Sequence, residues 1–90
     1  MRRAAKRDAS EPAIIAALRA IGALVQPLNG RDIPDLLIGY RGRIGLIEAK
    51  SRGGKLEPGQ QEFHQQWAAM PVGVAYNADD AIALVRGWWG

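Results

Sequence analysis

Two apolar segments within residues 33–50, separated by Arg41-Gly42, constrain the fold of this chain most strongly. Short runs rich in Leu and Ile on either side of a glycine-containing turn predict a β-hairpin. A two-residue loop at that turn sets Asp35 opposite Glu48 in the strand register. Opposed residues share one face of a sheet, with Cβ atoms about 4.5–5.5 Å apart. Lys50 points to the same face, because it lies two residues beyond Glu48.

Two facing carboxylates repel each other, so the pair Asp35 and Glu48 requires a compensating positive charge. Lys50 is one candidate for that charge. A hard divalent cation is the other, since Mg²⁺ takes oxygen ligands and is commonly held by one or two carboxylates. An ordinary surface network of Asp, Glu and Lys is the alternative. The flanking Leu, Ile and Gly residues favour a site, because the charges then emerge from otherwise buried strands.

The segment Pro34-Asp35, followed by a hairpin and Glu48-Ala49-Lys50, resembles the PD…(D/E)xK nuclease signature. The wider order of motifs resembles the virus-type replication-repair nuclease (VRR-Nuc) branch of that superfamily. That branch has an acidic residue early in a first helix, a glycine-containing loop before Pro-Asp-Leu-Leu, a Glu-x-Lys strand, a Gly-rich loop and a Gln that opens a second helix. The matching residues, in order, are Glu11, Gly30, Pro34-Asp35-Leu36-Leu37, Glu48-Ala49-Lys50, Gly53-Gly54 and Gln60.

The expected order of elements is helix, strand, a hairpin of two strands, helix, strand, helix. This order predicts an α/β fold with a four-stranded mixed sheet flanked by helices. The resemblance implies a restriction-endonuclease-like core. Residues 1–8 are expected to form a flexible basic arm, and residues 9–90 a single VRR-Nuc-like nuclease domain, since ninety residues suffice for one small domain.

The ends of these elements follow from local signals. Helix stop and start signals are Gly, Pro and capping residues. The first helix is expected to start near Ser10 as its N-cap and to end at Gly22, the second to open at Glu57-Pro58, and the third to run from Asn77 to about Arg86, with strands at 23–26 and 72–76.

The resemblance assigns catalytic and metal-binding roles to the hairpin. It implies that Asp35 and Glu48 bind Mg²⁺ or Mn²⁺ with help from the main-chain carbonyl of Ala49, while Lys50 orients or deprotonates a water molecule. Composition agrees with an oxygen-liking metal: the chain has no cysteine and one histidine, which argues against thiolate and zinc sites.

Glu11 is a candidate third carboxylate. Its spacing places it on the helical stripe of Ile14, Ile15 and Leu18, so it faces the core at the first turn. It either complements the helix dipole or points at the hairpin as a catalytic residue and candidate metal ligand. The resemblance favours the second role.

The second helix carries Gln60, Phe63, His64 and Trp67 along one face. We expect Phe63 and Trp67 in the core. Gln60 either holds a water or phosphate at the site, as the resemblance implies, or is a solvated first-turn residue. His64 is expected to be structural rather than a general base, because a lone His on an apolar helix face usually is.

The net charge of +3 is concentrated at the N-terminus and around the hairpin. A basic rim around acidic residues suits a polyanionic substrate, although a solvated charged surface and a disordered, solubilising N-terminus are the alternatives. The cations expected to contact DNA are Arg2, Arg3, Lys6, Arg7, Arg31, Arg52 and Lys55.

Together with these features, the resemblance implies a metal-dependent, structure-specific DNA endonuclease. Stand-alone family members resemble homodimers that resolve four-way (Holliday) junctions, and Trp88 and Trp89 are candidate dimer contacts unless they pack back onto the domain. The alternatives are a flap or simple duplex nuclease and a non-catalytic DNA-binding module on a nuclease-like fold. No apolar run reaches the ~20 residues of a membrane span, so we expect a cytoplasmic protein without a membrane partner.

Overall fold

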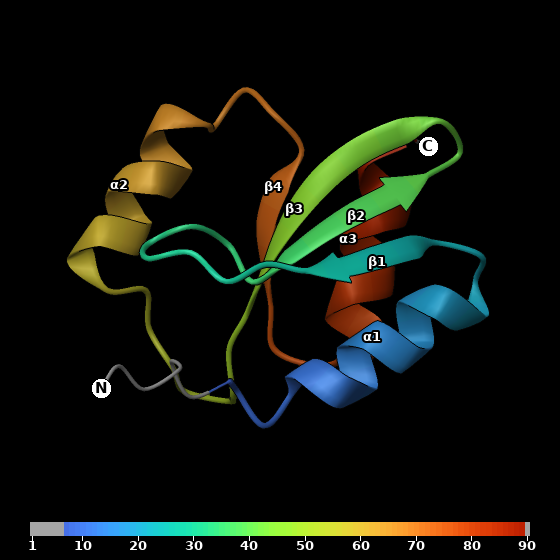
Figure 1. Cartoon of the computed structure of the whole chain (residues 1–90), viewed down its shortest axis with the longest axis horizontal. Coiled ribbons are helices and arrows are strands. Elements are labelled where there is room, and N and C mark those ends of the chain that lie inside the picture. Colours follow the sequence, from blue (N-terminus) through green and yellow to red (C-terminus); the bar gives the residue numbers. More distant parts are fainter. Residues whose placement is uncertain (1–6, 90) are drawn as a thin grey trace.

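A computed structural model describes residues 7–89 of the 90-residue chain, so the expected contacts of Arg2, Arg3 and Lys6 lie outside the described residues. The predicted order of elements is confirmed (Figure 1). The elements are α1 (Glu11–Ala20), β1 (Leu24–Pro27), β2 (Leu36–Tyr40), β3 (Arg43–Ala49), α2 (Pro58–Gln66), β4 (Val72–Ala75) and α3 (Ala78–Trp89).

The four strands form one mixed sheet in the order β1-β2-β3-β4. The pairs β1-β2 and β2-β3 are antiparallel, and β3-β4 is parallel. Tyr40 lies opposite Arg43, and Leu36 lies opposite Ile47. The predicted hairpin register is therefore confirmed, and the next pair outward is Asp35 and Glu48.

The core lies between one face of this sheet and the two helices α1 and α3, which contact each other. Figure 1 shows α3 running behind the strands. Side chains alternate between the two faces of a strand, so every second residue of β2 and β3 enters this core. The fully buried large aliphatic residues are Ile14, Leu18, Leu36, Ile38, Ile47 and Val85.

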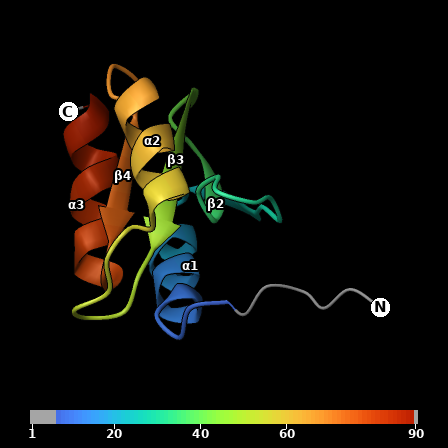
Figure 2. The same ribbon diagram turned by 90° about the vertical axis from the view of Figure 1, so that its left-hand side faces the viewer.

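The opposite face of the sheet is partly open. Leu24 and Ile44, which lie on that face, are 77% and 67% exposed. The loop between β1 and β2 projects on the side away from α3 (Figure 2). Asp35 and Glu48 belong to this open face, so the acidic pair does not emerge from a hairpin that is buried on both sides.

Helix α2 stands apart from the α1 and α3 layer (Figure 1) and has no fully buried residue. Phe63 and Trp67 stack with ring centroids 5.2 Å apart, and Trp67 is 44% exposed. The expectation that these two rings belong to the core is wrong. The two side chains share one face of α2 as expected, and their rings stack on each other outside the main core cluster.

Several element ends differ from the expected ones: β1 is shifted by one residue from 23–26, β4 ends at Ala75 and α3 ends at Trp89. The start of α1 is as expected, but without a capping bond. Ser10 occupies the N-cap position of α1, yet its hydroxyl donates to Asp8 Oδ1 at 2.7 Å and does not cap the helix. Helix α3 continues through Gly87 to Trp89, and Gly87 is not in the left-handed region that ends a helix. The extension is stabilised by Trp88, whose ring packs on Gly45 of β3.

Within residues 7–89, no helix has the length and apolarity needed to cross a membrane.

Candidate functional site

The site is built at the end of the β2-β3 hairpin that lies away from the Arg41-Gly42 turn. Asp35 immediately precedes β2, and its Oδ2 accepts a hydrogen bond of 2.8 Å from the main-chain N–H of Ala49. Glu48 lies one residue earlier in β3, directly across from Asp35 in the register. The hairpin therefore brings the two predicted carboxylates together on one face of the sheet.

Glu48 is almost completely buried, with 2% of its surface exposed. The pKa of its carboxyl is raised to about 8, first by burial and then by the facing Asp35, which hydrogen-bonds to the protonated form and repels the charged one. Lys50 lowers the pKa of Glu48, and Glu11 raises it. Without a cation, the Glu48 carboxyl therefore keeps its proton up to a pH of about 8, whereas an ordinary glutamate has a pKa of 4.5.

Gln60 connects α2 to the acidic pair. Its side-chain amide donates to Glu48 Oε2 at 3.2 Å, and its side-chain carbonyl accepts the main-chain N–H of Glu57 at 2.8 Å. The second bond satisfies one of the free donors at the helix N-terminus. Gln60 is therefore not a solvated first-turn residue. Its amide group is held by the Glu57 N–H and in turn orients one carboxylate oxygen of Glu48.

Glu11 faces inward as predicted, with 4% of its surface exposed. Its Oε2 accepts a 2.7 Å hydrogen bond from Arg7 Nε. Among residues 7–89, no three His, Cys, Asp or Glu side chains come together as a set of metal ligands. The structure therefore does not group Glu11 with Asp35 and Glu48 as a third ligand, because Arg7 engages one of its oxygens.

Two buried carboxylate oxygens, Glu11 Oε1 and Glu48 Oε1, have no hydrogen-bond partner within the described part of the chain. Such unpaired buried acceptors are costly in a folded protein. The side chains of Asp35 and Glu48 offer carboxylate oxygens, which are the ligands that Mg²⁺ and Mn²⁺ prefer. The residues present fit a hard divalent cation.

Lys50 follows β3, and its main-chain N–H donates to the carbonyl of Ala75 at 3.0 Å. A side chain at Gly54 would contact the aliphatic stem of Lys50, so the Gly53-Gly54 loop folds over that stem. The other predicted cations in this region, Arg31, Arg52 and Lys55, are exposed. They are free to approach a phosphate backbone without leaving a buried position.

Arg7 is placed differently from the other predicted DNA contacts. Besides its bond to Glu11, its guanidinium donates to the carbonyl of Leu28 at 3.0 Å, to Asn29 Oδ1 at 2.7 Å and to the carbonyl of Asp35 at 3.2 Å. These contacts direct the guanidinium of Arg7 toward the site, while 37% of its side-chain surface stays exposed to solvent.

Asp8 also lies next to the site, and the sequence did not indicate a role for it. Its carboxylate accepts hydrogen bonds from the hydroxyls and main-chain N–H groups of Ser10 and Ser51. Burial raises the pKa of Asp8, but these hydrogen bonds outweigh that effect and lower the pKa to about 2. The sequence signal for this role was weak, because Asp8 and Ser51 are far apart in the chain.

Two residues singled out for other roles are held within the domain. The ring of Trp88 packs against Gly45 and the core cluster, so this candidate dimer contact folds back onto its own chain. His64 is half-buried, and burial lowers its pKa. Its Nε2 is buried and has no hydrogen-bond partner among residues 7–89.

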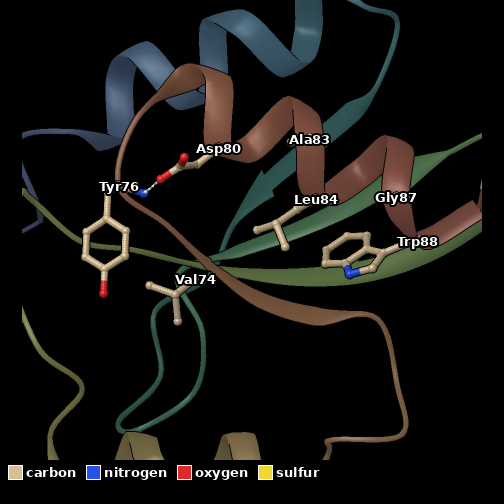
Figure 3. Close-up of a pocket in the computed structure, with 7 residues that line it drawn as sticks. All are labelled: Val74, Tyr76, Asp80, Ala83, Leu84, Gly87 and Trp88. Carbon is tan, nitrogen blue, oxygen red and sulfur yellow. Dashed lines mark hydrogen bonds between the residues drawn. The ribbon is translucent and has the colours of Figure 1, made fainter.

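A separate groove of about 540 Å³ lies between β4 and α3 (Figure 3). Its walls include Val74, Leu84 and Trp88, and its carboxylate, Asp80, already accepts the main-chain N–H of Tyr76 at 3.0 Å. The lining of this groove is mostly apolar, and its carboxylate Asp80 is hydrogen-bonded to the main chain. The groove therefore lacks a pair of facing carboxylates like Asp35 and Glu48.

Comparison with solved structures gives a match to a VRR_NUC domain. The two structures superpose with a TM-score of 0.73 and 26% sequence identity, over 89% of this chain and 94% of that chain. No protein-family model matches the sequence, and no curated protein is a significant match to it.

Proposed function

Because the chain belongs to the VRR-Nuc family and is a nuclease-type domain, we propose that it is an endonuclease that hydrolyses DNA phosphodiester bonds with Mg²⁺ or Mn²⁺. The observation that carries the proposal is the facing pair Asp35 and Glu48, in which the pKa of Glu48 is raised to about 8. Strongly perturbed carboxyls of this kind are typical of functional sites. A protein that only binds a polyanion gains nothing from a buried glutamate that faces a second, half-buried acid.

The ligands of the cation in this proposal are Asp35, Glu48 and the main-chain carbonyl of Ala49. When bound there, the cation supplies a water of lowered pKa and positive charge for the scissile phosphate. Asp35 is oriented by the Ala49 N–H, and Glu48 is oriented by Gln60. Such outer contacts of metal ligands fix the direction in which the ligands point.

Lys50 is the proposed group that orients or deprotonates the attacking water and stabilises charge as it develops on the phosphate. It lies two residues beyond Glu48 and close enough to lower the pKa of that carboxyl. Glu11 adds negative charge near the pair, because it raises the pKa of Glu48 whereas Lys50 lowers it.

The DNA backbone in this proposal runs over the exposed cations next to the hairpin. Arg31 lies in the loop before Asp35, and Arg52 and Lys55 lie in the loop after Lys50. The N-terminal cations Arg2, Arg3 and Lys6 are proposed to add further phosphate contacts. Neutralised phosphates release counterions, so DNA affinity should fall steeply with salt.

We propose a four-way junction as the DNA substrate and a homodimer as the active form. A two-fold dimer presents two equivalent sites, which matches the two-fold symmetry of a junction. The exposed Leu24 and Ile44 on the open face of the sheet provide apolar surface for self-association. Analytical ultracentrifugation tests this step: a sedimentation mass of one chain at assay concentration would remove the dimer from the proposal.

A cleavage assay on junction, flap and linear duplex DNA, with Mg²⁺, Mn²⁺ or EDTA, tests the function. We expect cleavage that requires the cation and is fastest on the junction. Faster cleavage of the flap or the duplex would reassign the substrate. Binding of all three DNAs without cleavage under any cation would show a binding module instead.

The variants Asp35→Asn, Glu48→Gln and Lys50→Ala are each expected to abolish cleavage and to leave DNA binding in place. Asp79→Asn is the matched control, because this acid is exposed in the first turn of α3 and distant from the hairpin in sequence. Cleavage at the wild-type rate by Glu48→Gln would reject the assignment of the site.

A further inference from the structure

Arg7 uses four of the five N–H groups of its guanidinium within the domain. Nε donates to Glu11, Nη1 donates to both the Leu28 carbonyl and Asn29 Oδ1, and Nη2 donates to the Asp35 carbonyl. One planar group thereby joins the first turn of α1, the loop after β1 and the residue that begins the catalytic hairpin. The bond to Asp35 is made to the main chain of the very residue whose side chain is proposed to hold the cation.

Asp8 makes the matching connection to the other end of the hairpin. Its Oδ2 accepts the main-chain N–H of Ser51 at 2.9 Å, and its Oδ1 accepts the Ser51 hydroxyl at 2.6 Å. Oδ1 also accepts the main-chain N–H and the hydroxyl of Ser10. Ser51 directly follows Lys50, so Asp8 fixes the backbone at the point where the proposed catalytic lysine leaves β3.

Arg7 and Asp8 are adjacent in the chain and hold the two strands of the hairpin on either side of the acidic pair. The strand ends they contact are separated from them by 28 and 43 positions in the sequence. The neighbouring strands also hold these ends: the Asp35 carbonyl accepts the main-chain N–H of Leu28 at 2.7 Å, and the main-chain N–H of Lys50 donates to the Ala75 carbonyl at 3.0 Å. Arg7 and Asp8 add side-chain contacts to these main-chain bonds.

We propose that Arg7-Asp8 is a strap whose two side chains position Asp35 and Lys50 for the reaction. Both act as positioning residues in this proposal, because their side chains are hydrogen-bonded to the main chain at Asp35 and Ser51. The expected effect of the strap on kcat rests on the proposed nuclease function. Its expected effect on amide hydrogen exchange rests on the hydrogen bonds alone. It assigns to Arg7 a role different from phosphate binding, the role that the charge of the N-terminal segment had indicated.

The charge-conserving variant Arg7→Lys separates these two roles. A lysine keeps the positive charge but cannot reproduce a planar fork with four donors in use. The strap predicts that Arg7→Lys and Arg7→Ala both lower kcat on saturating DNA by about 10- to 100-fold, the effect typical of removing a group that orients metal ligands. It also predicts an unchanged KM and an unchanged salt dependence of DNA binding.

A phosphate contact predicts the opposite pattern. Arg7→Lys would then retain wild-type kcat, and Arg7→Ala would reduce the slope of log affinity against log salt by about 0.9. That pair of results would overturn the strap. Arg86→Ala is the control for loss of an exposed arginine, because Arg86 lies on α3 and takes no part in the site.

Amide hydrogen exchange tests the strap without reference to cleavage. Arg7→Ala should speed exchange at the Ala49 N–H, which donates to Asp35, and Asp8→Asn should speed exchange at the Ser51 N–H, since one acceptor oxygen of Asp8 is replaced by an amide group. Exchange in the core strands, for example at Ile38, should stay at the wild-type rate and reports that each variant is folded.

Unchanged exchange at both Ala49 and Ser51 in folded variants would overturn the strap. Absence of cleavage by the wild-type protein on every DNA would instead overturn the proposed nuclease function, while the exchange experiment would still decide whether Arg7 and Asp8 hold the hairpin ends. Asp8→Asn provides the test independently if Arg7→Ala does not fold.

Discussion

The raised pKa of Glu48 predicts that the metal-free protein loses stability as the pH rises. A carboxyl whose pKa is about 8 in the folded state and 4.5 in the unfolded state holds its proton more tightly when folded. Its contribution is therefore fully present below pH 4.5 and is lost as the pH passes through about 8.

Within that window, the free energy of unfolding should fall by about 1.4 kcal/mol for each pH unit. Over the whole window the loss amounts to at most about 5 kcal/mol, which is comparable with the total stability of about 5–15 kcal/mol of a small domain. Glu48→Gln removes the titrating group, so its stability should not show this loss. His64 acts in the other direction, since its lowered pKa favours the folded state as the pH rises, and it does so in both proteins.

Urea denaturation in EDTA at a series of pH values between about 5 and 9 measures this difference, and subtracting the two proteins cancels His64 and every other shared group. Mg²⁺ added at the alkaline end should restore stability to the wild type but not to Glu48→Gln, because the cation binds the ionised carboxylate of the folded protein. Parallel pH profiles for the two proteins, or a wild-type stability that rises relative to Glu48→Gln across the window, would refute the reasoning.

Three further substitutions test the surroundings of the site and the fold. Gln60→Ala should weaken Mn²⁺ binding by about 10- to 100-fold in a calorimetric titration, because it removes the bond that orients Glu48; an unchanged affinity would exclude that role. Trp67→Ala should lower the free energy of unfolding by less than about 1 kcal/mol, whereas Leu18→Ala should lower it by about 2–5 kcal/mol, and similar urea midpoints for the two would contradict the exposed position of α2. Gly45→Val should destabilise the domain by about 1–3 kcal/mol and shift the fluorescence of Trp88, since an added side chain at Gly45 collides with that ring; a neutral substitution would contradict the packing.

The part of the site that depends on the hairpin was predictable from the sequence. A short turn fixes the register, and the two-residue period of a strand then decides which side chains share a face, so Asp35 and Glu48 could be placed opposite each other by counting. The inward position of Glu11 followed in the same way from the period of a helix.

The contacts that brace the site were not predictable by counting. Arg7 reaches Leu28, Asn29 and Asp35, and Asp8 reaches Ser51, through hydrogen bonds between segments that no periodic pattern relates. Local composition described this segment as charged and polar, which is equally true of a solvated arm and of a network of hydrogen bonds. Only the tertiary fold distinguishes the two.

The surroundings of the apolar residues were likewise beyond the reach of local patterns. A stripe such as Phe63 and Trp67 shows that a helix has an apolar face but not what covers that face. In the structure Phe63 is half-buried and Trp67 is exposed, so this face does not enter the main core. For Trp88 the reverse holds: its ring is accommodated because Gly45, on a strand distant in sequence, has no side chain.

The central claim is that Asp35 and Glu48 together form a site for a divalent cation. Paramagnetic broadening by Mn²⁺ in two-dimensional NMR spectra of the ¹⁵N-labelled protein tests this claim residue by residue. We predict that substoichiometric Mn²⁺ broadens the amide signals of Asp35, Glu48, Ala49 and Lys50 first, and that Glu48→Gln abolishes this selectivity. Broadening that begins instead at the exposed Asp79 of α3, or that is the same in Glu48→Gln, would contradict the claim.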